Sequence, residues 1–473
     1  MVNYNLLKDL SVKKLLLVAK DYLDANEKED ALSIISLALD KEHENPQVLF
    51  VAATIFLKCD KEGIAEVFYR RALEFDPKRS EIWGGVGRAI DGYTRPEEKI
   101  KYLKKALQLN PKNDKAMVNL TNAYLLDSQW GKALEWADKT LEVAPKSIGG
   151  RDNRGMAKLA LGDWTGWEDC LAGLGQKYRL DVQYCNEPRW DGSKDKELII
   201  YGAQGLGDEI LYGSCIPDAI SDCSHVIVDC DKRLESLFKR SFPQASVYGT
   251  RRIEASWLHH HTWDASCSID VLPVFYRNKD TDFPGKPFLK ACPVRRKQWR
   301  HTLDEMSDRP KIGIAWFGGG KLTARENRSV PVETFNELAE YGDLIDLEYE
   351  KHDHNDVPIT RFDFATLSQD YDDTAALVAE LDYVVTVCTA MVHLCGGLGV
   401  ECHVLLPEKP SWRYAYKDMI WYDSVHLHTN IDDIKETLYD LRTNRCDNPH
   451  IRGISAPGTK GSEISQDRAY GEM

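Results

Sequence analysis

The residues best suited to chemistry lie in one stretch near the middle of the chain, residues 198–211. An apolar run at its start predicts a buried strand, and Gly205, Gly207 and Asp208 follow before residues with helical spacing. Glycines let a ligand approach the backbone, and the first N–H groups of a helix suit a phosphate. Asp208 could cap the helix or act as a base. The fingerprint Gly-x-Gly-x-x-Gly is absent because position 210 is Ile, so a tight turn and a ligand site both remain open.

A second group of candidate residues follows another strand-like run that begins at residue 311. Lys321 and Arg328 come just after three consecutive glycines, 318–320, from where they could reach a diphosphate. Further on, Thr389 and the amides after it could hold phosphate oxygens, and His393 faces the same helix end. Each residue could instead be structural, the cations as solvated loop charges and His393 as a buried histidine. The combination of two glycine-rich openings with basic residues favours a phosphorylated ligand.

The elements that would position these residues begin after an internal repeat. Pro77, Pro111 and Pro145 are separated by 34 residues each time, and small residues recur before them, as at Ala72 and Ala106. Small residues let paired helices approach closely, and the proline ends the second helix of each pair. The pattern resembles the tetratricopeptide repeat. It predicts an α-solenoid over residues 1–180 that binds partners and does no chemistry, with residues 156–174 capping the stack.

Beyond the repeats, short apolar runs alternate with helical stretches, which predicts parallel sheets in two Rossmann-like lobes. We expect the lobes to span residues 181–305 and 306–445, followed by a tail at 446–473. The expected helices are 233–242 and 374–381, and the expected strands are 198–201, 225–229, 245–248, 311–316, 344–347, 383–387 and 402–406. Ligands of open parallel sheets bind at the carboxyl ends of the strands, so a substrate would lie in the cleft between the lobes.

Bulk properties exclude several classes of function. The 473 residues are 43% hydrophobic and 29% charged, as in a soluble globular protein. A net charge of −14 argues against nucleic acid as a partner, and no apolar run is long enough to span a membrane. Twelve cysteines without a Cys-x-x-Cys pair indicate reduced thiols in a cytoplasmic protein. The consecutive histidines 259–261 cannot all point one way, so we expect no metal site there.

A set of short motifs, taken in order, carries a family resemblance. Together they resemble bacterial tetratricopeptide-repeat proteins with a GT-B glycosyltransferase module, akin to the ADP-heptose heptosyltransferase family and more distantly to repeat-containing O-GlcNAc transferases. The motifs are Trp190-Asp191-Gly192, Gln204-Gly205-Leu206-Gly207-Asp208, Asn327-Arg328-Ser329-Val330-Pro331, Asp373-Thr374-Ala375-Ala376-Leu377, Thr389-Ala390-Met391-Val392-His393-Leu394, Leu405-Leu406-Pro407 and Ser411-Trp412-Arg413-Tyr414.

The resemblance implies a nucleotide-sugar donor held mainly by the second lobe, a protein or glycan acceptor, and neither metal nor cofactor. It implies that Asp208 is the base. The implied donor-binding residues are Gln204, Gly205, Gly207, Lys321, Arg328, Ser329, Glu348, Thr389, Ala390, Met391, His393 and Trp412. Glu348 lies where relatives tend to have Gln-Lys-Gly, and its carboxylate could accept hydrogen bonds from ribose hydroxyls. The family usually has Asp-Thr-Ala where this chain has Cys388-Thr389-Ala390.

Two hypotheses follow from these residues. In the first, the protein is an inverting, metal-independent glycosyltransferase: Asp208 removes the acceptor proton while Lys321, Arg328 and Thr389 stabilise the departing diphosphate. In the second, the repeats recruit a partner and the lobes bind nucleotide or glycan without turnover. Cys388 in place of a carboxylate favours the second hypothesis, whereas the presence of Asp208 and the two cations favours the first.

Overall fold

The computed structural model describes residues 7–176, 179, 181–202, 204–251, 253, 255–319, 325–352, 357–368 and 370–447. The chain forms two compact units, Met1–Lys158 and Leu159–Met473, which we call the repeat unit and the α/β unit. The predicted donor residue Lys321 and most of the predicted tail lie outside the described residues. None of the described helices is both long and apolar enough to cross a membrane.

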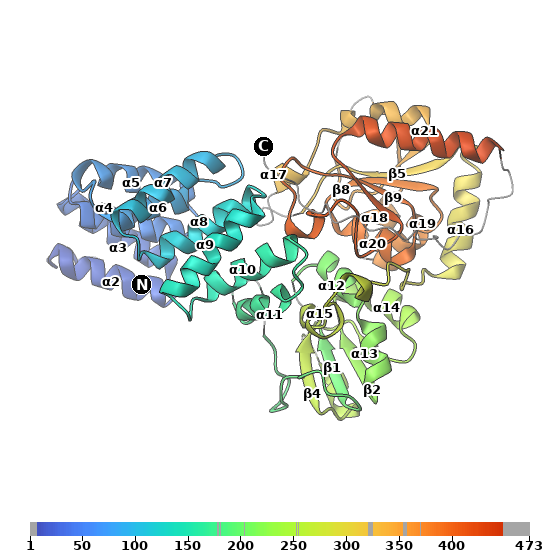
Figure 1. Ribbon diagram of the computed structural model, residues 1–473, viewed down its shortest axis with the longest axis horizontal. Coiled ribbons are helices and arrows are strands. Elements are labelled where there is room, and N and C mark those ends of the chain that lie inside the picture. The colour runs from blue at the N-terminus through green and yellow to red at the C-terminus, as the bar shows by residue number, and fades with distance from the viewer. Residues whose placement is uncertain are drawn as a thin grey trace. The chain divides into compact units, whose positions relative to one another are not determined.

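The repeat unit is a solenoid of helices packed in consecutive pairs (Figure 1). Small side chains make the close contacts between helices: Ala38, Ala72, Ala106 and Thr140 occupy the same place in successive repeats and are fully buried. This confirms the predicted tetratricopeptide-like solenoid. Its helices are α2 (Val12–Asp24), α3 (Lys28–Lys41), α4 (Pro46–Lys58), α5 (Glu62–Phe75), α6 (Ser80–Ala89), α7 (Pro96–Leu109), α8 (Asp114–Leu126), α9 (Trp130–Val143) and α10 (Ile148–Ala160).

The α/β unit contains two parallel sheets (Figure 1). The first has the order β3-β2-β1-β4, from β1 (Glu197–Tyr201), β2 (His225–Asp229), β3 (Ser246–Tyr248) and β4 (Ala265–Ser268). The strands predicted at 198–201, 225–229 and 245–248 are therefore confirmed. Strand β4 was not predicted because its residues, Ala-Ser-Cys-Ser, form no apolar run, yet all four are buried beside β1.

The second sheet has the order β10-β9-β8-β5-β6-β7, again with parallel pairs. Helix α21 (Ile431–Asp447) packs Ile434 and Leu438 into the apolar core with Ile312 and Val385 of the sheet. The predicted strands here are confirmed, whereas β7 and β10 were missed because each is short and partly exposed. The strands are β5 (Lys311–Ala315), β6 (Asp343–Asp346), β7 (Ile359–Arg361), β8 (Tyr383–Val387), β9 (Cys402–Leu405) and β10 (Val425–His428).

Short helices connect the strands of the α/β unit. The helix expected at 233–242 is found as α14, and the one expected at 374–381 begins and ends three residues earlier, as α19. The remaining helices that bear on the site are α12 and α20, which open after β1 and β8. The helices are α12 (Leu206–Gly213), α13 (Ile216–Asp222), α14 (Glu235–Ser241), α15 (Pro273–Tyr276), α16 (Pro293–Asp304), α17 (Arg325–Arg328), α18 (Asp363–Thr366), α19 (Tyr371–Val378) and α20 (Ala390–Leu398).

The segment expected to cap the repeats divides between the two units. Met156, on α10, packs against the apolar cluster of α7, α8 and α9, as expected for a cap. Trp164, and Trp167 on α11 (Gly166–Cys170), belong instead to the α/β unit. The Trp167 ring lies 5.6 Å from that of Trp412, and its Nε1 donates to the carbonyl of Arg277 at 2.9 Å. The expectation of a cap was wrong for these residues, because their indole rings find aromatic partners in the α/β unit.

Candidate functional site

The two helices that open after β1 and β8 meet at their N-terminal ends. A Cβ atom on Gly207 of α12 would lie 3.1 Å from Cα of Ala390, the first residue of α20, and 3.4 Å from the His393 ring. A side chain at position 207 would be tighter than most real contacts, so α20 would have to shift by a few tenths of an ångström to admit it. The N–H groups of both helix starts therefore lie close together, and this junction is the candidate site.

Both carboxylate oxygens of Asp208 have a partner at this junction. Its Oδ2 accepts a hydrogen bond from the backbone N–H of Gly205 at 3.3 Å, which caps α12. Its Oδ1 lies 2.7 Å from Nη2 of Arg413, and about a quarter of the side chain is exposed. The Arg413 guanidinium stacks over the Trp412 ring at 4.7 Å. Arg413 was not predicted as a site residue, although it belongs to the Ser411–Tyr414 motif that carried part of the resemblance.

The loop before α12 is held by two ion pairs. Gln204 has a φ of 61°, in the left-handed region. Its Nε2 donates a hydrogen bond to Oδ2 of Asp270 at 2.6 Å. The same oxygen of Asp270 forms an ion pair with Arg179 at 2.8 Å. The Gln204 carbonyl accepts from Arg251 at 2.8 Å, and Arg251 pairs at 2.7 Å with the fully buried Glu209. Burial raises the pKa of Glu209 to about 7. Gln204 thus has a structural role in this loop, and Gly205 follows it as the cap of α12.

Predicted residues that follow β5 and β8 gather around Gly318. Arg328 donates from Nη1 to the Cys388 carbonyl at 3.2 Å, and Ser329 accepts from the N–H of Gly318 at 3.1 Å. A Cβ atom on Gly318 would lie 3.3 Å from both the Cys388 carbonyl and the Thr389 methyl. The structure therefore brings Arg328, Ser329 and Thr389 together.

The start of α20 is capped by its own side chain. Oγ1 of Thr389 accepts from the N–H of Met391 at 3.1 Å, a typical N-cap bond. His393 is buried, and its Nδ1 lies 3.4 Å from the Tyr422 hydroxyl. Burial is the main cause that lowers the pKa of His393 to about 3, so this histidine is neutral at physiological pH. It cannot supply positive charge to a phosphate.

Three further positions are buried. The Cys388 side chain lies inside, and burial raises the pKa of its thiol to about 12, so no negative charge replaces the aspartate of the resembled family. Glu348 is 1% exposed, and its Oε1 accepts from the N–H groups of Trp316 and Phe317 at 2.6 and 2.7 Å. Burial raises the pKa of Glu348 to about 8, despite these bonds. Trp412 is 9% exposed and packs on Trp167.

The predicted site residues therefore divide into two groups. Gly207, Asp208, Ala390 and His393 meet at the junction of the two helices, and the group around Gly318 adjoins it through Thr389. Glu348 instead directs Oε1 to backbone N–H groups. Within the described residues no cluster of three or more His, Cys, Asp or Glu side chains could hold a metal ion.

Comparisons with known proteins find relatives of low sequence identity. No family model matches the chain. Protein FlbA of Caulobacter vibrioides is 26% identical over 407 residues, which cover 78% of this chain and 67% of that protein. Among solved structures, PilF of Pseudomonas aeruginosa is 19% identical and covers 36% of this chain and 80% of its own, with a TM-score of 0.32. PilW, a type IV pilus biogenesis factor, is 20% identical and covers 44% of this chain and 86% of its own, with a TM-score of 0.34. By its helix pairs and its 34-residue period, this chain is a tetratricopeptide-like repeat protein with a parallel-sheet α/β unit.

Proposed function

We propose that this chain is a binding protein in which the repeat unit holds a partner protein and the α/β unit does not turn over a substrate. The observation that carries the proposal is the Asp208–Arg413 ion pair at 2.7 Å. A general base needs a lone pair directed at the proton that it removes. Here one carboxylate oxygen of Asp208 binds a guanidinium and the other accepts the Gly205 N–H.

The same pair reduces the attraction of the junction for a phosphate. A guanidinium binds phosphate best when no carboxylate of the protein competes for its N–H groups. Neutral His393 and the neutral thiol of Cys388 add no charge that could compensate. The repeat unit contributes the binding function, because stacked helix pairs present an extended surface to a partner.

Glycosyl transfer in a GT-B arrangement is the second candidate, favoured by the approach of α12 to α20 at Gly207. In this mechanism a nucleotide-sugar diphosphate takes the place of Asp208 beside Arg413 and the helix amides. Asp208, released from Arg413, then takes the proton from the hydroxyl of the acceptor molecule. Arg328, Lys321 and Thr389 stabilise the leaving diphosphate. Transfer would continue in EDTA, because the cations and amides replace a metal.

One substitution separates the two candidates. In a binding protein, Asp208→Asn removes the carboxylate that competes for Arg413, so nucleoside diphosphate should bind about tenfold more tightly. In a transferase, the same change should lower turnover about 10²- to 10⁴-fold. Both are measured on the full chain, by calorimetry with ADP, GDP and UDP and by release of diphosphate from nucleotide sugars. Asn retains the cap, so the melting temperature should change little.

Asp195→Asn is the matched control, since Asp195 lies in an exposed turn before β1. It should change neither affinity nor turnover. Turnover by the wild type that Asp208→Asn abolishes and Asp195→Asn preserves would overturn the binding-protein proposal.

A further inference from the structure

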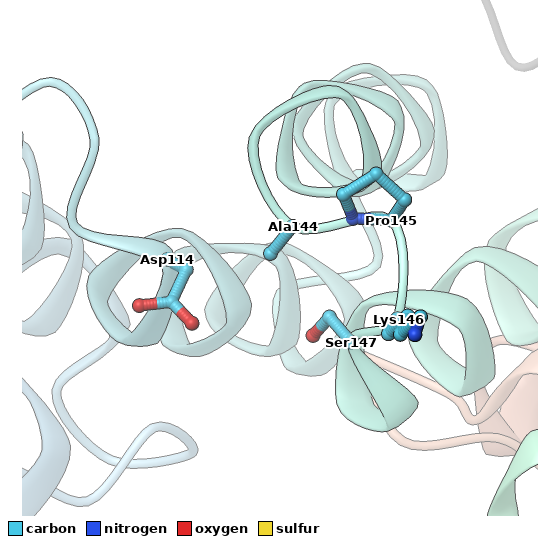
Figure 2. A pocket seen from close by; sticks show the side chains of 5 residues that line it. All are labelled: Asp114, Ala144, Pro145, Lys146 and Ser147. Atoms are coloured by element: carbon cyan, nitrogen blue, oxygen red, sulfur yellow. The ribbon is translucent and has the colours of Figure 1, made fainter.

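An open hollow of about 470 Å³ lies at the edge of the repeat unit, where α9 ends and α10 begins. Figure 2 shows Asp114, the first residue of α8, on one side of it and Ser147 on the other. Ala144 lies between them, and Pro145 adds apolar surface on the side of Ser147. Lys146 also lines the hollow, but its side chain is seen end-on and does not cross to Asp114.

In the two preceding repeats, the residue that corresponds to Ser147 bonds to the repeat before it. The acceptor is the equivalent of Asp114 in one case and the residue after that equivalent in the other. Ser147 corresponds by the 34-residue period to Asn113 and Arg79. The Asn113 amide donates from Nδ2 to the Ser80 hydroxyl at 2.8 Å, and Ser80 corresponds to Asp114. The Arg79 guanidinium donates from Nη1 to Oε1 of Gln47 at 2.7 Å. In both repeats an N–H donor of the later repeat reaches an oxygen of the earlier one.

At the third step the acceptor is present and the donor is missing. Ser147 is short, and its Oγ accepts the N–H of Gly150 at 3.1 Å. The carboxylate of Asp114 has no hydrogen-bonding or ion-pairing partner among the residues that the structure describes. Because the acceptor here carries a negative charge, the group that fits it is a cation with N–H donors.

Apolar residues flank the segment that lines the hollow. Val143, the last residue of α9, and Ile148, the first of α10, have exposed fractions of 40% and 47%. An aliphatic stem that enters the hollow would pack on this surface and on Pro145. A guanidinium at the end of such a stem meets the carboxylate in a planar fork and is more weakly hydrated than an ammonium.

We propose that this hollow binds an arginine side chain from an extended segment of the partner protein, with the guanidinium on Asp114. The inference rests on the proposed partner-binding role of the repeats and names the chemistry of that partner. Inside the chain, Arg79, two repeats before Ser147, places its guanidinium on Gln47, one residue beyond the equivalent of Asp114.

The test uses labelled heptapeptides with a central arginine between leucine, proline or serine residues, and the same peptides with citrulline. Fluorescence polarisation with the full chain should show that the arginine peptides bind and that citrulline weakens binding about tenfold, because a charge-assisted bond is lost. Asp114→Asn should weaken the arginine peptides by a similar factor and leave the citrulline peptides unchanged. Added salt should weaken arginine binding.

Two further variants test the location of the site, one by blocking the hollow and one as a control. Ser147→Arg supplies a guanidinium from within the chain, at the position that Arg79 occupies two repeats earlier, so it should abolish peptide binding and raise the melting temperature of the repeats. Glu142→Gln removes an exposed carboxylate that does not line the hollow and should leave binding unchanged.

Several results would overturn the assignment. Equal weakening by Glu142→Gln and Asp114→Asn would show diffuse electrostatic attraction. Unchanged binding in Ser147→Arg, or no binding of any arginine peptide, would place the partner elsewhere. The other half of the proposed function, that the α/β unit does not turn over a substrate, is judged separately by the turnover of wild type and Asp208→Asn, so the two failures can be told apart.

Discussion

At the scale of single residues, the α/β unit buries carboxylates whose charge is poorly solvated. Glu348 is an example: its Oε1 accepts two backbone N–H bonds, yet burial dominates and raises its pKa from 4.5 to about 8. A raised folded-state pKa means that the native protein binds the proton more tightly than the unfolded chain does. The stabilisation is therefore fully present below about pH 4.5 and is lost as pH rises through about 8.

Glu348→Gln tests this residue, because glutamine resembles the protonated carboxyl at every pH. We expect the variant to be close to the wild type near pH 5 and to exceed its free energy of unfolding by about 4 kcal/mol near pH 8.5. Urea unfolding at the two pH values measures the difference. Glu350→Gln is the control, since the Glu350 side chain is 43% exposed. Parallel pH profiles for wild type and Glu348→Gln would contradict the assigned pKa shift.

At the scale of elements, the five-residue helix α11 contributes a buried aromatic ring to the packing of the α/β unit. Trp167 is 3% exposed, and its ring lies 6.4 Å from that of Tyr212 on α12 and 6.2 Å from that of Trp421, which precedes β10. Trp164 extends the cluster, with its ring 4.6 Å from that of Phe283. A short helix is stabilised mainly by such packing, because its own hydrogen bonds are few.

Trp167→Ala should therefore lower the stability of the α/β unit by about 3–5 kcal/mol, the usual effect of deleting a buried aromatic ring. The repeat unit should unfold as before, so calorimetry should show one shifted transition. Leu171→Ala is the control: Leu171 follows α11 and is 36% exposed, so we expect a loss below about 1 kcal/mol. A shift confined to the repeat transition would show that Trp167 supports the solenoid instead.

At the scale of the whole molecule, the chain separates into two units between Lys158 and Leu159. Each has its own buried core, which is the physical requirement for independent folding. The hollow at Asp114 belongs to the repeat unit, and the junction at Asp208 belongs to the α/β unit. Their functions should therefore be separable by truncation.

A chain that lacks residues 1–145 should keep the melting transition of the α/β unit and its affinity for nucleoside diphosphate. It should lose arginine-peptide binding, because Asp114, Ala144 and Pro145 are removed. A chain that lacks residues 1–175 also loses Trp164 and Trp167, and its α/β unit should be less stable by several kcal/mol. Equal stability of the two truncated chains would refute the packing role of α11; peptide binding by the shorter deletion would refute the location of the hollow.

The sequence by itself determined the repeat and most strands of the α/β unit. Prolines and alanines at a period of 34 residues and apolar runs such as Leu198–Tyr201 report burial locally, since each element must present an apolar face to a core. Only the tertiary structure decided the rest. Ala265–Ser268 is a strand because β1 lies beside it. Arg413 meets Asp208 from 205 residues away, and Ser147 leaves open a gap that Asn113 closes one repeat earlier. Such pairings depend on where distant elements place their side chains, and no local pattern encodes that geometry.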